Sequence, residues 1–356
     1  MLTILHKYLL RQNFILMSII LISGIAIYLI VDFVTRMNAV VESGIHVTTA
    51  LRYFGYKIPL IVTQIMPAIF MLAVIIQLAL MYRNHEMTAL GTSAISFVRP
   101  AMFFIAYSFI MFFILLLFAE TIGIRGYQET KIIWDSDIRQ RQIEGRGIEN
   151  LWFKEDETIV FIRQVWPDSN MGSEIIVHRL KGQDTIQEII RAPGFQVEKG
   201  VWKLMQPVIT DVHGYKVTFQ EEFQMTLRTD LSSFSAIASR LPYESLSIFT
   251  LSTVITQLRD SGSNVERLAT AWHSKIAYAF ALVVMTILGL AMITLIKNVY
   301  ALVTLGLVVV FLYYTVYVFG VSYAEEGLIP PFWGAWLANV LFGTLGLGQI
   351  IWSRRE

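Results

Sequence analysis

The stretch MYRNHEMTALGTSAISFVRP, Met81–Pro100, is a short polar island between two strongly apolar runs. It holds Arg83, His85, Glu86 and Arg99, whereas neither flanking run has a charged residue in its interior. A charge at the centre of a membrane helix costs about 2.5–3.5 kcal/mol on insertion scales, so this pattern is typical of two spans joined by a loop. The island therefore predicts a helical membrane protein, and it raises the question of what the loop itself does.

The composition of the whole chain agrees with a membrane protein. Its 356 residues are 55% hydrophobic with a mean hydropathy of +0.57, too apolar for one soluble domain. The net charge of +1 gives no field that would attract nucleic acid. The sequence has no cysteine, which excludes disulfides and thiolate metal sites. Its six histidines are scattered without helical pairing, so a histidine metal site is not favoured either.

Six apolar runs reach the roughly 18–25 residues that a spanning helix needs. No run has Asp, Glu, Lys or Arg in its interior. We expect the first run to be a retained anchor, because no small-x-small signal-peptide cleavage site follows it. The predicted spans are Phe14–Val31, Ile58–Tyr82, Pro100–Ala119, Ile276–Ile296, Val299–Tyr323 and Phe332–Trp352.

The distribution of lysine and arginine predicts the orientation, because short cytosolic loops are enriched in both. With the N-terminus in the cytosol, two short loops lie outside. One holds Arg36, Arg52 and Lys57, and the other has no basic residue. The balance predicts both termini in the cytosol and places the long segment from about residue 120 to residue 275 outside. The cytosolic set is Lys7, Arg11, Arg83, Arg99, Lys297, Arg354 and Arg355.

The segment from about residue 150 to residue 240 has the period of β-structure. In YKVTFQEEFQMTL, Tyr215–Leu227, apolar and polar residues alternate, which predicts a half-buried strand. QVEKGVWKL is typical of a hairpin that turns at Glu198-Lys199-Gly200, and TIVFIRQVW and SEIIVHRL are further strands. Short strands between turn residues predict an all-β sandwich or jelly roll.

An amphipathic helix follows this region. Ser261-Gly262 supplies its stop, and we expect it to lie at the outer membrane surface or against the β domain. The apolar residues at helical spacing are Ile248, Leu251, Val254, Ile255 and Leu258.

Motifs for catalysis are absent from the sequence. It has no GxxxxGK[ST] loop, GTSAI lacks the second glycine of a nucleophile elbow, and HEMTA is not HExxH. The carboxylates Glu129, Asp135 and Asp137 lie in a polar stretch and are best explained as a solvated face. The sequence therefore predicts that the chain is not an enzyme.

The island favours a short helix with Met87, Leu90 and Ala94 on one stripe. This stripe could pack on the membrane surface or on neighbouring spans. Alternatively, it could fit a groove in a partner protein, with Glu86 pairing with a basic residue there. Arg36 also has two interpretations, because it could snorkel to lipid headgroups or contact an anionic substrate.

The layout resembles the LptF/LptG family of lipopolysaccharide export permeases over essentially the full chain. The stretches that carry the resemblance are EMTALGTSAIS after the second span, AE at Glu120, NLWFK at Asn150–Lys154, and LPYESLSIFTL…LRDSG…AWHSKIA before the fourth span. NLWFK and WHSKIA are more similar to LptG than to LptF.

The resemblance implies an inner-membrane ABC permease with a periplasmic β-jellyroll. It implies an LptB-like ATPase dimer that uses the ATP, an LptF-like second permease, an LptC-like protein, a periplasmic bridge, and no cofactor on this chain. The implied domains are 1–120, with a coupling helix at about 84–97, then 121–243 and 244–356. The implied coupling residues are Glu86, Met87, Ala89, Leu90, Ser93 and Ile95, and the implied headgroup-binding residues are Arg36, Lys57 and Lys131.

The chain departs from the family pattern in places. Ala94 stands where the family often has Gly, Gly91 where it has Arg or Gln, and Leu60 where a Lys commonly follows the proline. The alternative from another class is an extracytoplasmic sensor or assembly scaffold anchored by six spans. A sensor needs a cytosolic output module, and the largest cytosolic piece here is the island.

Overall fold

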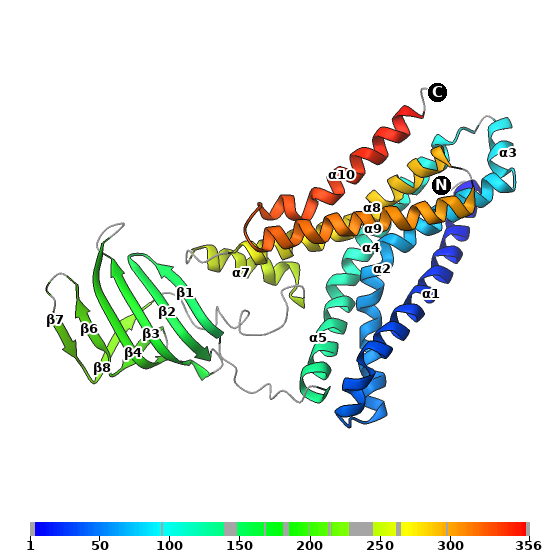
Figure 1. The fold of residues 1–356 in the computed structure, drawn as a ribbon. Coiled ribbons are helices and arrows are strands. Elements are labelled where there is room, and N and C mark those ends of the chain that lie inside the picture. The colour runs from blue at the N-terminus through cyan, green and yellow to red at the C-terminus, as the bar shows by residue number, and fades with distance from the viewer. Residues whose placement is uncertain are drawn as a thin grey trace. The chain divides into compact units, whose positions relative to one another are not determined.

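The computed structural model describes most of the chain as two compact units (Figure 1). Unit 1 comprises residues 1–140, 243–248 and 266–356, and unit 2 comprises residues 141–242 and 249–265. The described residues are 4–93, 95–138, 148–166, 169–180, 185–198, 200–212, 214, 216–227, 245–260, 265–296 and 298–353. Ala94, Lys199, Ser261-Gly262, Lys297, Arg354 and Arg355, which the sequence analysis used, lie outside them.

Unit 1 is built from long helices, and the described chain has six that are long and apolar enough to cross a membrane. They confirm the six predicted spans and the fold class of a helical membrane protein with an inserted β domain. Several helices extend beyond the apolar run, and the first has 39 residues. The helices are α1 (Ile4–Glu42), α2 (Val47–Arg83), α3 (Glu86–Thr92), α4 (Val98–Phe118), α5 (Ile124–Ile132), α8 (Glu266–Leu295), α9 (Val299–Glu325) and α10 (Pro331–Trp352).

The third span does not end at its apolar limit. Two π-helical segments, η1 (Ala119–Gly123) and η2 (Ile133–Ile138), join with α5 to continue α4 as far as Ile138. A Cβ atom at Gly126 would lie 2.6 Å from the Tyr56 carbonyl, so α5 packs very closely on α2. Residues 121–140, which the sequence analysis assigned to the connectors of the β domain, thus belong to unit 1.

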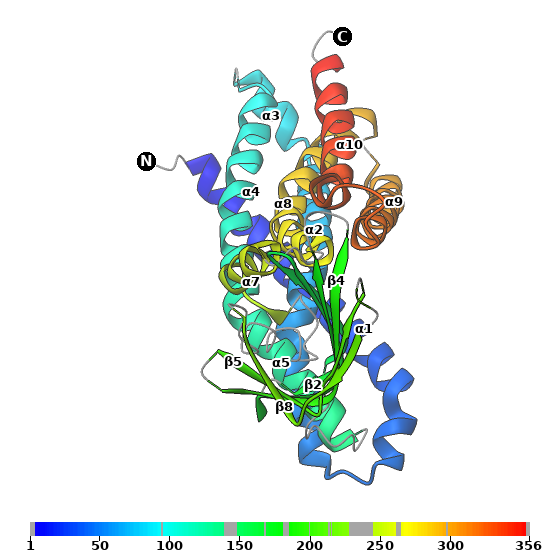
Figure 2. The ribbon, with the colours of Figure 1, turned by 90° about the vertical axis from the view of Figure 1, so that its left-hand side faces the viewer.

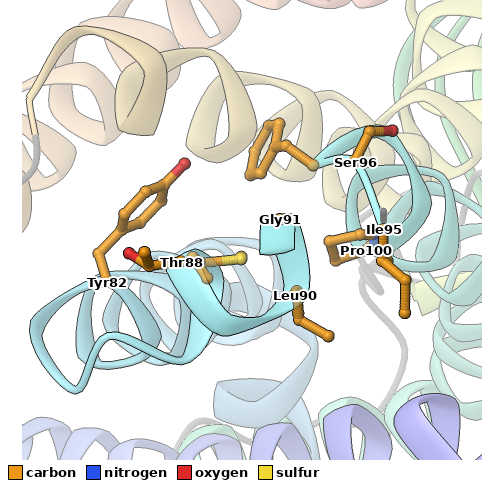
Figure 3. Close-up of a pocket in the computed structure, with 9 residues that line it drawn as sticks. Tyr82, Thr88, Leu90, Gly91, Ile95, Ser96 and Pro100 are labelled. Carbon is orange, nitrogen blue, oxygen red and sulfur yellow. The ribbon is translucent and has the colours of Figure 1, made fainter. Parts of the chain in front are cut away.

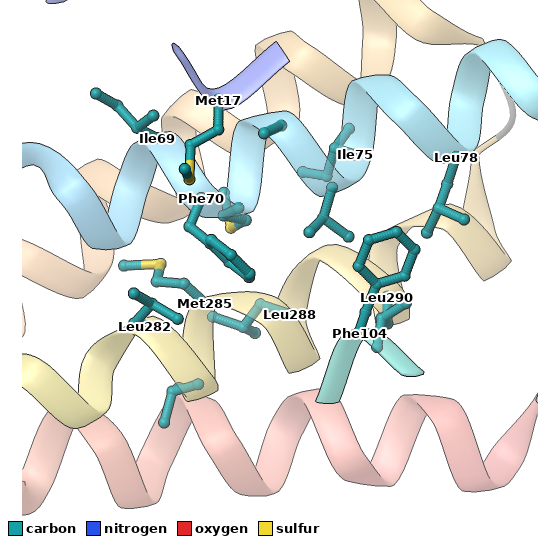
Figure 4. Packing of buried hydrophobic residues seen from close by; sticks show 14 of the residues in the cluster. Met17, Ile69, Phe70, Ile75, Leu78, Phe104, Leu282, Met285, Leu288 and Leu290 are labelled. Atoms are coloured by element: carbon teal, nitrogen blue, oxygen red, sulfur yellow. The ribbon is translucent and has the colours of Figure 1, made fainter. Parts of the chain in front are cut away.

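The core of unit 1 lies between α2, α4 and α8 (Figure 4). Phe70 and Ile75 of α2, Phe104 of α4 and Leu290 of α8 are fully buried. Of the six candidate spans, α8 is the most buried and α1 the least. The exposed apolar surface of α1 is what a helix in contact with lipid or another membrane helix requires.

Polar side chains join the spans at a few points. Tyr313 of α9 donates to Asn339 of α10 at 2.7 Å, and Asn339 donates to the Ala277 carbonyl of α8 at 2.8 Å. Gln77 of α2 donates to the Leu9 carbonyl of α1 at 3.0 Å. Such bonds satisfy polar groups that have no water partner in the bilayer core, so they fix how neighbouring spans pack.

Unit 2 contains one antiparallel sheet of eight strands. Six strands lie in the order β1-β2-β3-β4-β5-β8, while β6 pairs with β4 and β7 pairs with β6. Figure 2 shows that the sheet is strongly curved. The strands are β1 (Ile148–Glu155), β2 (Thr158–Trp166), β3 (Met171–Leu180), β4 (Ile186–Glu198), β5 (Val201–Met205), β6 (Val208–Asp211), β7 (Lys216–Phe219) and β8 (Glu222–Thr226).

Among the described strands, sequence neighbours pair from β1 to β5 and again in β6 and β7, while β5 does not pair with β6 and β7 does not pair with β8. The single strand predicted over Tyr215–Leu227 is wrong in detail, because it divides into β7 and β8 on two different partners. The neighbouring segment also divides, into β5 and β6, at Gln206, whose φ is +47°. Val217 and Phe219 are exposed in β7, whereas Met225 in β8 is buried. The break therefore ends the alternating pattern of burial.

The buried face of the sheet is apolar and aromatic. Trp202 of β5 is fully buried and stacks on Phe195 of β4, with 5.1 Å between ring centroids. The predicted hairpin between β4 and β5 is confirmed by their pairing, and Gly200 provides the positive φ of +80° that its turn needs. The predicted amphipathic helix is α7 (Ile248–Asp260), which buries Leu251 and Leu258, and its residues from 249 onward belong to unit 2.

The crossing of α9 and α10 gives a test of the packing in unit 1. A Cβ atom at Gly334 would overlap with the Ala324 Cβ and would lie 2.7 Å from the Gly320 carbonyl. We expect Gly334→Ala to force these helices apart and to lower the free energy of unfolding by about 1–3 kcal/mol. Thermal unfolding in detergent, followed by tryptophan fluorescence, measures this.

Gly348 on the same helix is the matched control, because nothing lies within 4 Å of its added Cβ. Gly348→Ala should therefore leave the melting temperature unchanged or slightly raised. Equal melting temperatures for the two variants would contradict the close crossing.

Candidate functional site

The polar island folds into α3, as predicted, but the helix has only seven residues. His85, with φ +62°, turns the chain out of α2, and Glu86 begins the new helix. The Ile95 N–H donates back to the Leu90 carbonyl at 2.9 Å, which closes the C-terminal end. The helix is thus shorter than the expected range of about 84–97.

The apolar stripe of α3 faces the chain itself. Met87 and Leu90 are partly buried and pack against the core of unit 1. Ala89 and Ser93 are exposed on the other side. Of the two explanations for the stripe, packing on neighbouring spans is the one that the structure shows. The exposed side of α3 is thus formed by small residues, and Met87 and Leu90 lie on the side toward the spans.

A cavity of about 200 Å³ lies beside α3. Figure 3 shows Tyr82 of α2, Thr88 and Leu90 of α3, and Pro100 of α4 around it. Ile95, one of the expected coupling residues, also lines this cavity. The island thus leaves incompletely filled space where it meets the spans, which gives α3 room to shift.

Glu86 is held by the first span. The Tyr8 hydroxyl of α1 donates to Glu86 Oε2 at 2.8 Å. Close by in the sequence, His6 stacks on Phe103 of α4 with 5.0 Å between ring centroids. The acidic residue that was expected to pair with a partner protein therefore has a partner on α1.

At the opposite end of the spans, two of the expected headgroup-binding residues meet on a third residue. Asp32 Oδ1 of α1 accepts from Arg36 Nε at 3.0 Å and from Lys57 Nζ of α2 at 2.5 Å. The Arg36 side chain is 34% exposed, whereas those of Asp32 and Lys57 are 10% and 6% exposed. Arg36 thus reaches the surface while Lys57 is enclosed.

Lys131, the third expected residue, is part of the continuation of the third span. It pairs with Asp135 one turn further on, at 3.3 Å. Trp134 lies between them in sequence, and the Arg36 guanidinium carbon is 4.1 Å from the centroid of its ring. The structure thus brings Arg36 and Lys57 together on Asp32, while Lys131 pairs with Asp135 on the continuation of the third span.

Sequence reasoning missed Asp32 and Trp134. The Asp32–Arg36 spacing of four residues on a helix was a usable signal, because such pairs face each other. The contact of Asp32 with Lys57 spans 25 residues and two helices, and no local pattern marks it.

A third polar point joins the spans to the segment that leads into α7. Glu120, within η1, accepts from Lys275 Nζ of α8 and from the Ile248 backbone N–H, both at 2.7 Å. The Gln128 amide also donates to the Ser245 carbonyl at 3.1 Å. Glu120 therefore connects the third span, the fourth span and the start of α7.

These features define a class: a multi-pass helical membrane protein with a β-sheet domain inserted between its third and fourth spans. The family model described as lipopolysaccharide export system permease LptF/LptG matches residues 7–355. The chain belongs to this family, and it is a multi-pass protein of the inner membrane. It is also 24% identical over 323 residues, 88% of each chain, to the lipopolysaccharide export system permease protein LptG of Haemophilus influenzae (strain ATCC 51907 / DSM 11121 / KW20 / Rd).

The Glu120 contacts predict a measurable effect on stability. Glu120→Gln keeps an oxygen for the Ile248 N–H but loses the charged partner of Lys275. Because both side chains are mostly buried, at 16% and 14% exposure, we expect a loss of about 1.5–3 kcal/mol in thermal unfolding. The charge swap Glu120→Lys with Lys275→Glu should recover only part of the lost free energy of unfolding, because lysine cannot accept from the Ile248 N–H.

Lys131→Met is the control in the same unit. It removes a more exposed i,i+4 pair, so its effect should stay below about 0.5 kcal/mol. Full recovery of stability by the charge swap would show that the Ile248 contact contributes nothing.

Proposed function

We propose that this chain is a permease subunit of an ABC transporter. In this proposal it extracts lipopolysaccharide from the outer leaflet of the inner membrane and passes it through its β domain to a periplasmic bridge. The observation that carries the proposal is the match of the export-permease family over residues 7–355. The six spans and the inserted sheet fit a subunit that handles a lipid rather than a soluble substrate.

The orientation follows from the charge distribution. The lysine and arginine bias places both termini and α3 in the cytosol, and the sheet in the periplasm. ATP is bound and hydrolysed by a separate cytosolic ATPase dimer, since the sequence has no phosphate-binding loop. This chain is then no enzyme and needs no cofactor of its own.

The coupling site is the exposed face of α3. Ala89 and Ser93 are small, so they let a partner surface come close to the helix. Met87 and Leu90 anchor the helix to the core and transmit its movement to the spans. The cavity beside Leu90 gives α3 space to move when the ATPase closes.

The lipid side of the proposal rests on Arg36 and on the apolar surfaces. Lipid A carries phosphates and acyl chains, and a basic residue at headgroup depth attracts the former with about 1 kcal/mol. The buried face of the sheet is apolar and could shield acyl chains, whose exposure costs about 0.8 kcal/mol per CH₂.

The partners follow from the family. We propose an LptB-like ATPase dimer, an LptF-like second permease and an LptC-like bitopic protein, which places this chain in the LptG role. The LptG name of the Haemophilus influenzae relative supports that choice.

Substitutions on α3 test the coupling site. Ala89→Arg places a long charged side chain on the exposed face without touching the core, so the ATPase should be lost in a pull-down. Leu90→Arg is a poorer test, because Leu90 packs on the spans and its loss would disturb folding.

Tyr300→Arg is the control, since Tyr300 is 81% exposed at the start of α9, beside the loop that follows α8. It should leave ATPase recovery unchanged. Full recovery of the ATPase with Ala89→Arg would remove α3 from the interface.

The wider proposal is tested by mild-detergent purification of the tagged chain, with mass spectrometry of the proteins that co-purify. We expect a cytosolic ATPase and a second permease of the same layout. Recovery of a signalling protein instead would support the alternative of a sensor or scaffold.

A further inference from the structure

We propose that Asp32 is a positioning residue for anion recognition. It holds Arg36 so that the terminal guanidinium nitrogens meet a lipid phosphate. Lys57 is the buried counter-ion of Asp32 and not a lipid ligand. This inference rests on the proposed function and assigns separate roles to residues that the sequence analysis grouped as equivalent. It also adds Asp32, an acidic residue, to a site expected to be purely basic.

The hydrogen bonds of the Arg36 guanidinium involve one of its three nitrogens. Its Nε donates to Asp32 Oδ1 at 3.0 Å. Within the described part of the chain, its two terminal nitrogens have no acceptor. A guanidinium held through Nε keeps its terminal N–H groups available, and these groups match the oxygens of a phosphate.

Aromatic packing holds the same group from another side. The Arg36 guanidinium carbon lies 4.1 Å from the Trp134 ring centroid and 6.0 Å from that of Tyr53. A stacked guanidinium loses little further freedom when it binds an anion, because its orientation is already limited. Asp32 and Trp134 together thus prepare Arg36 for binding.

The burial of Lys57 excludes it from the headgroup surface. Its side chain is 6% exposed, and its ammonium contacts Asp32 at 2.5 Å and the Tyr53 hydroxyl at 3.4 Å. An ammonium in such a place needs a counter-ion, which Asp32 supplies. Asp32 in turn is fixed by Lys57 from α2, so its carboxylate cannot follow Arg36 outward. The third cation, Lys131, is engaged by Asp135.

The net charge of the cluster of Asp32, Arg36 and Lys57 can be kept constant while Asp32 is removed. Arg36 and Lys57 contribute two positive charges and Asp32 one negative charge, giving +1. The double variant Asp32→Leu with Lys57→Met removes one charge of each sign, leaves +1 and provides no acceptor for Arg36 Nε. It therefore removes the support of Arg36 without changing the attraction of the cluster for an anion as a whole.

The test uses the full chain with its co-purified partners in nanodiscs. A photoreactive amino acid replaces Met37, which is next to Arg36 and 47% exposed. The probes are hexa-acylated lipid A with both phosphates and the same lipid A without phosphate, and the readout is the ratio of the two captured amounts. A purely structural defect lowers both amounts and leaves this ratio unchanged.

We expect the protein with native Asp32 and Lys57 to prefer the phosphorylated form. The double variant and Arg36→Gln should each lose this preference several-fold. Asp32→Glu keeps the charge but moves the carboxylate by one methylene, so its preference should lie between that of the native protein and that of the double variant. This substitution replaces the double variant in the test if the double variant fails to fold. Glu42→Gln, which removes an exposed negative charge at the end of the same helix, should keep the full preference.

A double variant with an undiminished preference would overturn the role of Asp32. Equal capture of both lipids by the protein with native Asp32 and Lys57 would also overturn it, while the captured lipid A would still support the export function. Capture of neither lipid would count against both proposals.

Discussion

The bilayer core offers no partner to a charge or to a free backbone group, and the structure follows from that constraint. The ionic contacts Asp32–Lys57 and Glu120–Lys275, like the Tyr8–Glu86 hydrogen bond, lie at or near the ends of apolar runs. Between these ends the spans meet mainly through apolar packing, helped by a few hydrogen bonds such as the one between Tyr313 and Asn339. Chemistry that needs charge is thereby confined to the two ends of the helical unit.

Within this frame, sequence reasoning succeeded wherever a pattern is local. Long apolar runs predicted all six spans, and the segments TIVFIRQVW and SEIIVHRL predicted the strands β2 and β3. The turn at Gly200 was visible because a two-residue hairpin loop requires a positive φ. In each case the property that decides the structure lies within a window of about 20 residues.

The same reasoning failed where contacts between residues distant in the sequence determine the structure. The alternation over Tyr215–Leu227 continues without a change of period, yet β7 and β8 pair with different strands. The stripe of Met87 and Leu90 is equally suited to a partner or to the spans, and only the fold shows that the spans cover it. Asp32 lies four residues before the predicted site residue Arg36, but its role depends on Lys57, which comes from another helix.

The first helix links the two ends physically. It carries Tyr8, which holds Glu86 of α3, and it carries Asp32 and Arg36, which form an ionic cluster with Lys57. At 1.5 Å per residue these points are about 40 Å apart on one continuous helix. A helix transmits an axial displacement with little loss, because its hydrogen bonds run along the axis. Since α1 is also the least buried span, it can shift or rotate with less disruption of the core than α8. Within this chain, α1 is tied to α3 near one end by the Tyr8–Glu86 contact and to α2 near the other end by the Asp32–Lys57 contact. The first helix is therefore held near its two ends by polar contacts, while the apolar stretch between them is the least buried of the six candidate spans.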